Sequence, residues 1–374
     1  MTHVAEHDSL RLFLCGDLMT GRGIDQILPH PSDPRLYEPY VRDARQYVEL
    51  AEEVSGSIPR AVEPAYIWGD ALAVLQQRQP DLRIVNLETS VTCSDEPWLG
   101  KGIHYRMHPR NIGCLTAAGI DCCVLANNHV MDWGRAGLEE TLDNLHAAGI
   151  HTAGAGRNRA QAAAPAILEV AGKGRLIVFS LGLDSSGIPW DWEADAGHSG
   201  VNLLPDLSDD SVARLGRQVG AVKVPGDTVM LSIHWGGNWG YDIPYEHRRF
   251  ARRVIDTAGV DLVHGHSSHH PLGIEVHHGR PILYGCGDLF NDYEGIGGYE
   301  EYRGELSLMY LPDIDPADGR LLGLEMVPLR IRGFRLQQAE PADVAWLAGT
   351  LQREGGALGT TVEIGDTGNL LLRW

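Results

Sequence analysis

The sequence predicts an α/β protein, and three features of the chain lead to this class. Short apolar runs alternate with segments of helical period, which is the βα rhythm of an α/β sheet. Most of the apolar runs end directly in Gly, Asn, His or a carboxylate, as strands do at the edge of a sheet where sites lie. Residues 305–374 alternate apolar and polar side chains in places, which indicates antiparallel strands.

The first half of the chain is predicted to pass from strand to polar loop to helix three times. The predicted strands are 10–17, 82–88 and 122–126, and the predicted helices are 41–54, 66–79, 111–119 and 137–148. Residues 25–64 are long, polar and rich in proline. We interpret them as an insertion, such as a lid or a wall of a substrate site.

The second half is predicted to continue the same pattern. Its strands are predicted at 176–181, 228–233, 260–263 and 281–284, and its helices at 209–220, 247–258 and 342–354. Residues 184–204 carry Trp190, Trp192 and His198 and are interpreted as a second insertion. No internal repeat, low-complexity run or linker divides the chain, so residues 1–374 are predicted to form a single domain.

Composition limits the partners and the location. The formal net charge is −19, from 50 acidic and 31 basic residues, whereas nucleic acids and anionic membranes require a basic face. Neither is therefore expected as a partner. The six cysteines form no CxxC pair, which favours reduced thiols in the core. No apolar run approaches the length of a membrane span and no signal peptide is recognised, so we expect a cytoplasmic protein.

The strand predicted at 260–263 leads into a concentration of histidines. His264, His266, His269 and His270 fall within seven residues. Imidazole is the commonest protein ligand of metal ions and titrates near neutral pH. A solvated polar turn would explain one such histidine, whereas four of them favour a metal or acid/base site.

The other predicted strands end in polar groups of the same kinds, and their order resembles that of a known family. The order is that of the calcineurin-like metallophosphoesterases, and it is more closely similar to their CapA-like branch, named for poly-γ-glutamate capsule synthesis. The resemblance covers residues 10–295. Its motifs are Gly16-Asp17-Leu18-Met19 with Gly21-Arg22, Asn86-Leu87-Glu88, Ala126-Asn127-Asn128-His129 with Asp132 and Gly134, His234-Trp235-Gly236, and Gly265-His266-x-x-His269 with Glu275.

The resemblance implies a four-layer α/β/β/α sandwich, the calcineurin-like metallophosphoesterase fold, with the site on loops at one edge of two facing sheets. Some residues depart from the family. A dinuclear phosphoesterase carries His where Met19 stands and an Asp-bearing motif where Glu88 stands. CapA-like proteins usually have Glu near Asn238, Asn near Asp288, and a signal or membrane anchor. Because a thioether replaces an imidazole at Met19, we expect one divalent ion (Ca, Mn or Mg) instead of two.

This combination is similar to a lasso-peptide epimerase of the CapA-like branch. That similarity implies a metal-dependent peptide epimerase that inverts the Cα of the C-terminal Trp of a ribosomal precursor peptide. Inversion requires one group to remove a proton and a second group to return it on the other face, which suits His held by carboxylates. The alternatives are a metal-dependent phosphoesterase or hydrolase, and a CapA-like factor of poly-γ-glutamate biosynthesis. The sequence leaves the oligomeric state open.

Residue roles are expected as follows. The catalytic candidates are His129, His266, Asp17, Asp132 and Asp288, and the metal-ligand candidates are Asp17, Glu88, Asn128, His234 and His269. Arg22 is expected to neutralise a substrate carboxylate, and Trp235 and Trp239 to stack on an indole. The alternatives are helix caps for the two aspartates nearest a helix start, Asp17 and Asp132, a salt bridge for Arg22, and core packing for the tryptophans.

Overall fold

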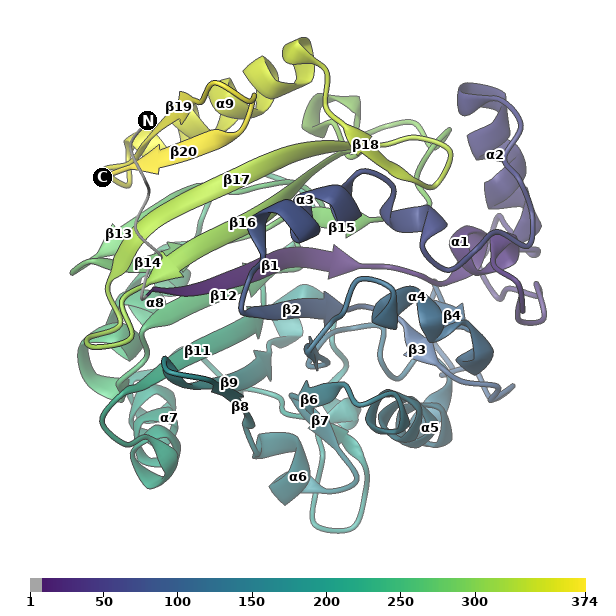
Figure 1. Cartoon of the computed structure of the whole chain (residues 1–374). Helices are drawn as coiled ribbons and strands as arrows, with labels where there is room; N and C mark the ends of the chain where they lie inside the picture. The colour runs from purple at the N-terminus through teal and green to yellow at the C-terminus, as the bar shows by residue number, and fades with distance from the viewer. Residues whose placement is uncertain (1–8) are drawn as a thin grey trace.

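A computed structural model describes residues 9–374 (Figure 1). Its larger sheet has ten strands in the order β19-β20-β17-β16-β1-β2-β5-β6, with β15 paired to β1 and β18 to β17. The strands are β1 (Leu10–Leu18), β2 (Leu82–Leu87), β5 (Cys122–Val124), β6 (His151–Ala153), β15 (Asp288–Phe290), β16 (Leu306–Ile314), β17 (Leu321–Ile331), β18 (Leu336–Gln338), β19 (Thr361–Ile364) and β20 (Leu370–Arg373).

The second sheet has six strands in the order β13-β14-β12-β11-β9-β8. They are β8 (Ala166–Val170), β9 (Gly174–Gly182), β11 (Asp227–His234), β12 (Leu262–His266), β13 (Ile274–His277) and β14 (Arg280–Leu283). Two short pairs lie outside these sheets, namely β3 (Ser90–Val91) with β4 (Arg106–Met107), and β7 (Ala155–Gly156) with β10 (Gly200–Val201).

The helices are distributed along the whole chain. They are α1 (Arg22–Ile27), α2 (Arg45–Ser55), α3 (Ala71–Arg78), α4 (Gly113–Thr116), α5 (Gly134–Ala147), α6 (Arg159–Ala163), α7 (Asp209–Val222), α8 (Tyr245–Ala258) and α9 (Pro341–Gly356). Single 3-10 turns occur at Tyr66–Trp68, Pro109–Asn111, Asp184–Ser186, Trp190–Trp192 and Glu300–Tyr302. The predicted α/β class is confirmed.

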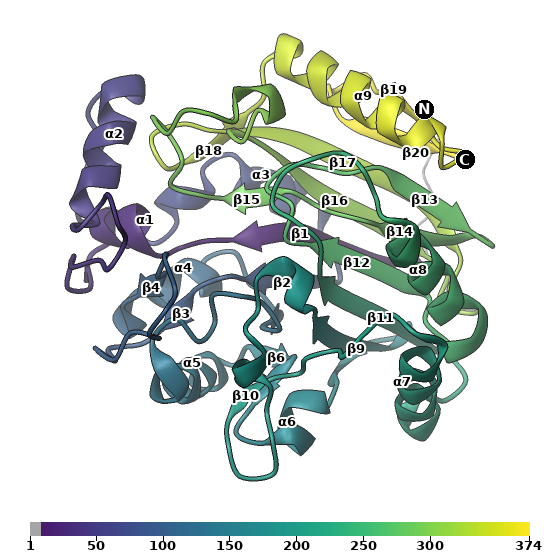
Figure 2. The same ribbon diagram turned by 180° about the vertical axis from the view of Figure 1, so that it is seen from behind.

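Three apolar cores hold the sheets and helices together. Side chains alternate across a strand, so Leu12 of β1 packs in a core shared with β9 and β11 of the smaller sheet. Phe13 points to the other side, into a core that contains residues of α3 and α5. The outer face of the smaller sheet packs on α7 and α8, where Leu215 and Val254 are buried. Figure 2 shows α7 and α8 against this sheet.

The topology brings the ends of the central strands to one edge. β1, β2 and β5 run parallel in the larger sheet, and β9, β11 and β12 run parallel in the smaller one. The carboxyl ends of parallel strands meet at the same edge of a sheet. Since each of these strands except β9 was predicted to end in a polar candidate residue, those residues lie at this edge.

Several predicted boundaries differ from the structure. The helix predicted at 66–79 is interrupted at Gly69, which has a φ of +45° and lies so close to Leu336 that a Cβ there would be 2.0 Å from its carbonyl oxygen. The predicted helix 41–54 begins only at Arg45, and β8 and α6 were not predicted. Both proposed insertions have little strand structure, with α2 in the first and two 3-10 turns in the second. The single-domain organisation stays a prediction.

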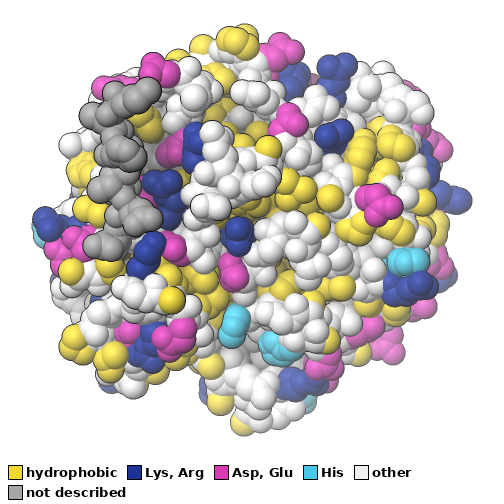
Figure 3. Space-filling model, viewed as in Figure 1, with side chains coloured by type: hydrophobic (Ala, Val, Ile, Leu, Met, Phe, Trp, Pro, Cys, Tyr) yellow, Lys and Arg dark blue, Asp and Glu magenta, His cyan; other side chains and the backbone are white. Residues whose placement is uncertain are grey.

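Within residues 9–374 no helix is long and apolar enough to cross a membrane. The face drawn in Figure 3 carries lysine and arginine side chains interspersed with acidic ones. That face therefore shows no continuous basic patch of the kind that nucleic acids require. The expected cytoplasmic location and the expected absence of nucleic-acid partners stay predictions.

Candidate active site

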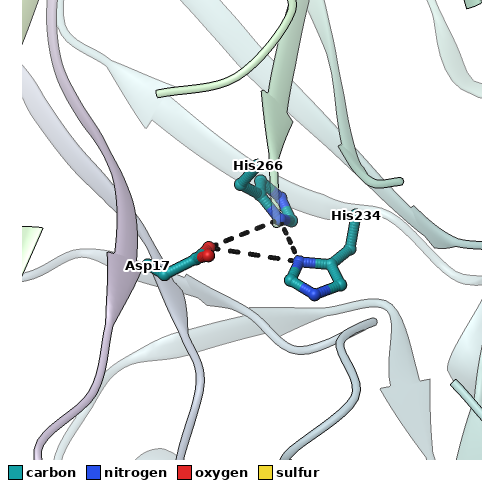
Figure 4. Close-up of side chains that lie close together, drawn as sticks. All are labelled: Asp17, His234 and His266. Carbon is teal, nitrogen blue, oxygen red and sulfur yellow. Dashed lines mark hydrogen bonds and ion pairs between the residues drawn. The ribbon is translucent and has the colours of Figure 1, made fainter. Parts of the chain in front are cut away.

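Asp17, His234 and His266 converge at the ends of β1, β11 and β12, and Figure 4 shows their side chains pointing toward one another. The Nδ1 atoms of His234 and His266 are 2.7 Å apart. Asp17 Oδ1 lies 4.0 Å from the first of these nitrogens and 3.9 Å from the second. All three side chains are buried. Two imidazoles and a carboxylate that face one point form a candidate metal centre.

A hydrogen-bond chain fixes which nitrogen of His266 faces this centre. His264 Nε2 lies 2.8 Å from the carbonyl oxygen of Cys15, which can only accept, so this nitrogen carries the hydrogen. His264 Nδ1 is then an acceptor for the Ser232 hydroxyl, 3.0 Å away. The same hydroxyl oxygen lies 2.8 Å from His266 Nε2 and accepts its N–H. The lone pair of His266 therefore sits on Nδ1, toward the centre.

The electrostatics of the cluster fit a divalent cation. Asp17 Oδ2 is buried and has no hydrogen-bond partner among residues 9–374. Burial and the Asp288 carboxylate raise the pKa of Asp17 to about 7, and burial and Asp17 raise the pKa of Glu88 well above its usual range. Burial lowers the pKa of His234 and His266 well below the usual value, so both rings are neutral and can act as ligands. Crowded buried carboxylates next to neutral imidazoles are stabilised by a metal ion.

A second group of possible ligands shares Asp17. His269 and Asp288 complete it, with His269 Nδ1 2.8 Å from Asp288 Oδ1 and 4.0 Å from Asp17 Oδ2. Although burial opposes it, the Asp288 carboxylate raises the pKa of His269. Next to this group, the Tyr293 hydroxyl lies 3.5 Å from His269 Nε2 and 3.6 Å from the sulfur of Met19. The structure thus provides candidate metal-binding groups, while the expected single ion stays a prediction.

His129 and Asp132 form a hydrogen-bonded pair on the Glu88 side of the centre. His129 Nδ1 is 2.6 Å from Asp132 Oδ2, and Asp132 also accepts the backbone N–H of Tyr105 at 2.7 Å. The Lys101 ammonium lies 2.7 Å from Asp132 Oδ1. His129 Nε2 faces the site, 3.8 Å from Glu88 Oε1. Burial lowers the pKa of His129 to about 4, so the neutral ring can accept a proton at this nitrogen.

Glu88 and Asn128 connect this pair to the metal-binding cluster. Glu88 Oε1 lies 3.9 Å from His234 Nε2, and Asn128 Oδ1 lies 3.2 Å from the same nitrogen. Both residues follow strand ends, of β2 and β5 respectively. Their positions allow them to orient His234 or to bind a metal ion, and the structure brings all five predicted metal ligands into one site.

Two of the three predicted substrate-binding residues are occupied elsewhere. The Arg22 guanidinium is buried and binds Asp292, with Nε 3.0 Å from Oδ2, and Glu38, with NH1 3.1 Å from Oε1. Trp235 is buried, stacks on His247 at 4.4 Å and donates its indole N–H to a backbone carbonyl. Both side chains already have these partners, and their expected substrate roles stay predictions. Trp239 is half-buried, with its ring 5.3 Å from His269, at the border of the site.

Sequence reasoning missed three residues of the site. Lys101 reaches it from a loop, contacts the backbone oxygen of Asn128 and lies 4.9 Å from the Trp192 ring. Ser232 was hidden within a predicted strand, and Tyr293 follows the last matched motif. His264, one of the four clustered histidines, is buried and belongs to the hydrogen-bond chain described above. Only the strand period could have indicated that Ser232 and His234 share a face.

The chain is similar in sequence to known proteins. Residues 11–293 match the family described as bacterial capsule synthesis protein PGA_cap. A "Probable polyglutamine synthesis accessory protein" of Mycobacterium tuberculosis is 48% identical over 356 residues, covering 95% of this chain and 93% of that protein. The "PGA biosynthesis protein CapA" of Bacillus subtilis is 27% identical over 281 residues, covering 70% and 64%. The "Capsule biosynthesis protein CapA" of Bacillus anthracis is 22% identical over 291 residues, covering 77% and 61%.

Proposed function

Because the chain belongs to the bacterial capsule synthesis family PGA_cap, we propose that it acts in glutamate-polymer synthesis as a metal-dependent enzyme. The resemblance to the CapA-like branch is thereby confirmed, and the similarity to its M. tuberculosis relative extends over 95% of the chain. One observation carries the enzymatic part of the proposal. The buried group of Asp17, His234 and His266 adjoins two His–carboxylate pairs, His129 with Asp132 and His269 with Asp288.

A divalent ion fits the cluster, and the residues that would hold it are Asp17, His234 and His266, with Glu88 and Asn128 beside them. When bound, such an ion supplies Lewis-acid stabilisation to an oxygen that gains negative charge. The two facing sheets and the outer helices support assignment of the four-layer metallophosphoesterase-type sandwich to this chain. In that fold the sheet edge where these side chains meet would hold the ion.

The chain's own groups support proton transfer. His129 Nε2, with its Nδ1–H held by Asp132, is a candidate base next to Glu88. His269, held by Asp288, is a candidate acid next to Asp17. A glutamyl polymer carries a carboxylate on each residue, and the Lys101 ammonium, held by Asp132 Oδ1 at 2.7 Å, adds positive charge next to His129 that attracts such a carboxylate. These features favour an anionic glutamyl chain as substrate.

Epimerisation of a peptide's C-terminal Trp is the second candidate, because two His–carboxylate pairs can serve the two faces of a Cα. The names of the relatives concern polyglutamine, capsule and PGA synthesis, and none of them mentions a lasso peptide. The glutamyl-polymer function is therefore placed first. Inversion at Cα is also a possible reaction on a glutamyl chain, so substrate and reaction type need separate tests.

One incubation in D2O separates these alternatives. The purified protein is mixed with Mn²⁺ and, in parallel, with γ-linked glutamate oligomers, a Trp-terminated peptide and an aryl phosphate. We expect metal-dependent change of the glutamate oligomers, seen by mass spectrometry either as chain shortening or as deuterium gained at Cα. The change should disappear in His234→Ala. Reaction with only the peptide or only the phosphate, or no reaction with any of the three, would overturn the proposal.

A further inference from the structure

A second group of histidines and an aspartate lies outside the active site, on the surface. Asp256 stands in the last turn of α8, His277 ends β13, and His278 begins the turn to β14. His277 Nε2 is 2.8 Å from Asp256 Oδ1, and His278 Nδ1 is 3.2 Å from the same oxygen. The two imidazole rings stack, with centroids 4.1 Å apart and planes inclined by 24°.

The hairpin turn explains why two consecutive side chains reach the same carboxylate. Neighbouring residues of a strand point to opposite faces. His278, however, has a φ of +51° and Gly279 a φ of +77°, which is the backbone of a two-residue hairpin turn. His277 pairs with Arg280 across this turn. The positive φ turns the His278 ring back onto the His277 ring, and both then face the end of α8.

A buried carboxylate supports the ring of His277 from behind. Glu275 Oε1 lies 4.0 Å from His277 Nδ1. Glu275 is itself held by Arg252 Nε at 2.7 Å and by the Tyr284 hydroxyl at 2.8 Å. In this contact His277 Nε2–H donates to Asp256 Oδ1. An ion bound between them would replace that hydrogen, and the ring hydrogen would then lie on Nδ1, toward Glu275. A carboxylate behind a histidine ligand is the usual supporting arrangement of metal sites.

We infer that Asp256, His277 and His278 form a surface metal site that takes a zinc-like divalent ion and ties α8 to the β13–β14 hairpin. Two imidazoles and one carboxylate suit Zn, Ni, Co or Cu better than Ca or Mg. Ligands at 2.0–2.1 Å from zinc in a tetrahedron lie about 3.3 Å from one another. The present distances of 2.8 and 3.2 Å need only a small opening to reach that value.

The site has room for water to complete the coordination. The His278 side chain is 71% exposed and that of Asp256 31% exposed, whereas the His277 side chain is 18% exposed. The ion would connect α8 with the β13–β14 hairpin. Of these, α8 directly precedes β12 in the chain, and β14 pairs with β12. An ion at this position stabilises the surroundings of the strand that carries His266 without touching the active site. Figure 2 shows α8 beside this part of the smaller sheet.

Zinc binding tests the inference on the untagged full-length protein. Equilibrium dialysis against zinc chloride, with zinc determined by atomic absorption, should give about one equivalent less for His278→Ala than for the wild type. The rise of the unfolding temperature with zinc should shrink in the same variant. His198→Ala is the matched control, since His198 is an exposed histidine that pairs with a single carboxylate, Asp195, at 2.8 Å.

A second variant distinguishes zinc bound at the surface site from zinc bound at the active site. His234→Ala should lose the zinc of the active site and keep that of the surface site. The double variant with His278→Ala should lose the zinc of both sites. If hydrogen bonds alone hold Asp256 to the two rings, His278→Ala and the wild type will bind equal amounts of zinc. That result overturns the inference, as does an equal loss in His198→Ala and His278→Ala.

Discussion

His264 and His266 hydrogen-bond to one hydroxyl, that of Ser232 on the neighbouring strand. The two histidines lie on the same face of β12, since side chains two residues apart in a strand point the same way. Only His266 faces the candidate metal centre. His264 instead ends the chain of hydrogen bonds on a backbone carbonyl of β1. The pair thus fixes the tautomer of a metal-ligand candidate from inside the core.

Removing the Ser232 hydroxyl should weaken metal binding. In Ser232→Ala the His266 Nε2–H loses its acceptor, so the tautomer with a free Nδ1 is no longer favoured. Loss of such supporting groups typically costs 10–100-fold in metal affinity, and we expect a decrease of about that size. Isothermal titration with Mn²⁺ measures it directly.

Ser180→Ala is the matched control for this variant. Ser180 pairs with Ser232 in register on β9 and is also buried. Its hydroxyl has no hydrogen-bond partner in the part of the chain that the structure describes. It should bind Mn²⁺ like the wild type. Equal affinities of Ser232→Ala and Ser180→Ala would show that the hydroxyl does not orient His266.

Asp17→Asn should separate metal binding from stability. The substitution keeps the oxygen that accepts from Asn86 at 2.8 Å but removes a buried charge next to Asp288. We expect the metal-free variant to be more stable than the metal-free wild type above about pH 8, where Asp17 is ionised. Addition of Mn²⁺ at about 100 times its Kd should stabilise only the wild type, by about 2.7 kcal/mol. Urea unfolding with and without metal gives both numbers, and a metal response kept in Asp17→Asn would contradict this assignment.

Local pattern was sufficient for most of the strands and long helices. β1, β2 and β11 are apolar runs buried on both faces, and their limits follow from the polar residues at their ends. The helix predicted through Gly69 failed for a reason that lies far away in the sequence. Its backbone must leave helical geometry because β18 passes next to it. Contacts of this kind are not encoded in the local period.

The same distinction between local pattern and contacts of distant segments applies to the candidate site. Asp17, His234 and His266 could be predicted to meet, because parallel strands end at a common edge. Lys101 could not be predicted, since it reaches Asp132 from a loop without any period. The ion pair of Arg22 could not be predicted, because its partner Asp292 is 270 residues away in the chain. The positions of residues at strand ends can therefore be predicted from the sequence, whereas those of loop residues cannot.

Arg22 is expected to contribute to stability instead of substrate binding. In Arg22→Met the buried carboxylates of Asp292 and Glu38 lose their cation, and breaking a buried ion pair on one side typically costs about 3–5 kcal/mol. Arg157→Met, which removes an exposed pair with Asp143, should cost less than about 1 kcal/mol. Urea unfolding measures both. If Arg22→Met keeps wild-type stability and only loses substrate affinity, the earlier substrate role is correct.

His247 should make the stability of the protein depend on pH. It is buried against Trp235, and burial lowers its pKa to about 4, compared with about 6.5 in an unfolded chain. Between these values the unfolded chain binds a proton that the folded protein does not. Stability contributed by neutral His247 is therefore complete above about pH 6.5 and is lost progressively as the pH falls toward 4.

His247→Phe keeps the stacking on Trp235 and removes this proton linkage. From about pH 7.5 to about pH 5 the wild type should lose roughly 2 kcal/mol more of its free energy of unfolding than the variant. Urea unfolding at the two pH values provides the comparison. His151→Phe, at an exposed strand position, should follow the wild type. A parallel loss of stability in His247→Phe and the wild type would mean that the His247 ring is protonated in the folded protein. Its burial against Trp235 opposes this charge, because no carboxylate among the described residues lies within hydrogen-bond distance of the ring.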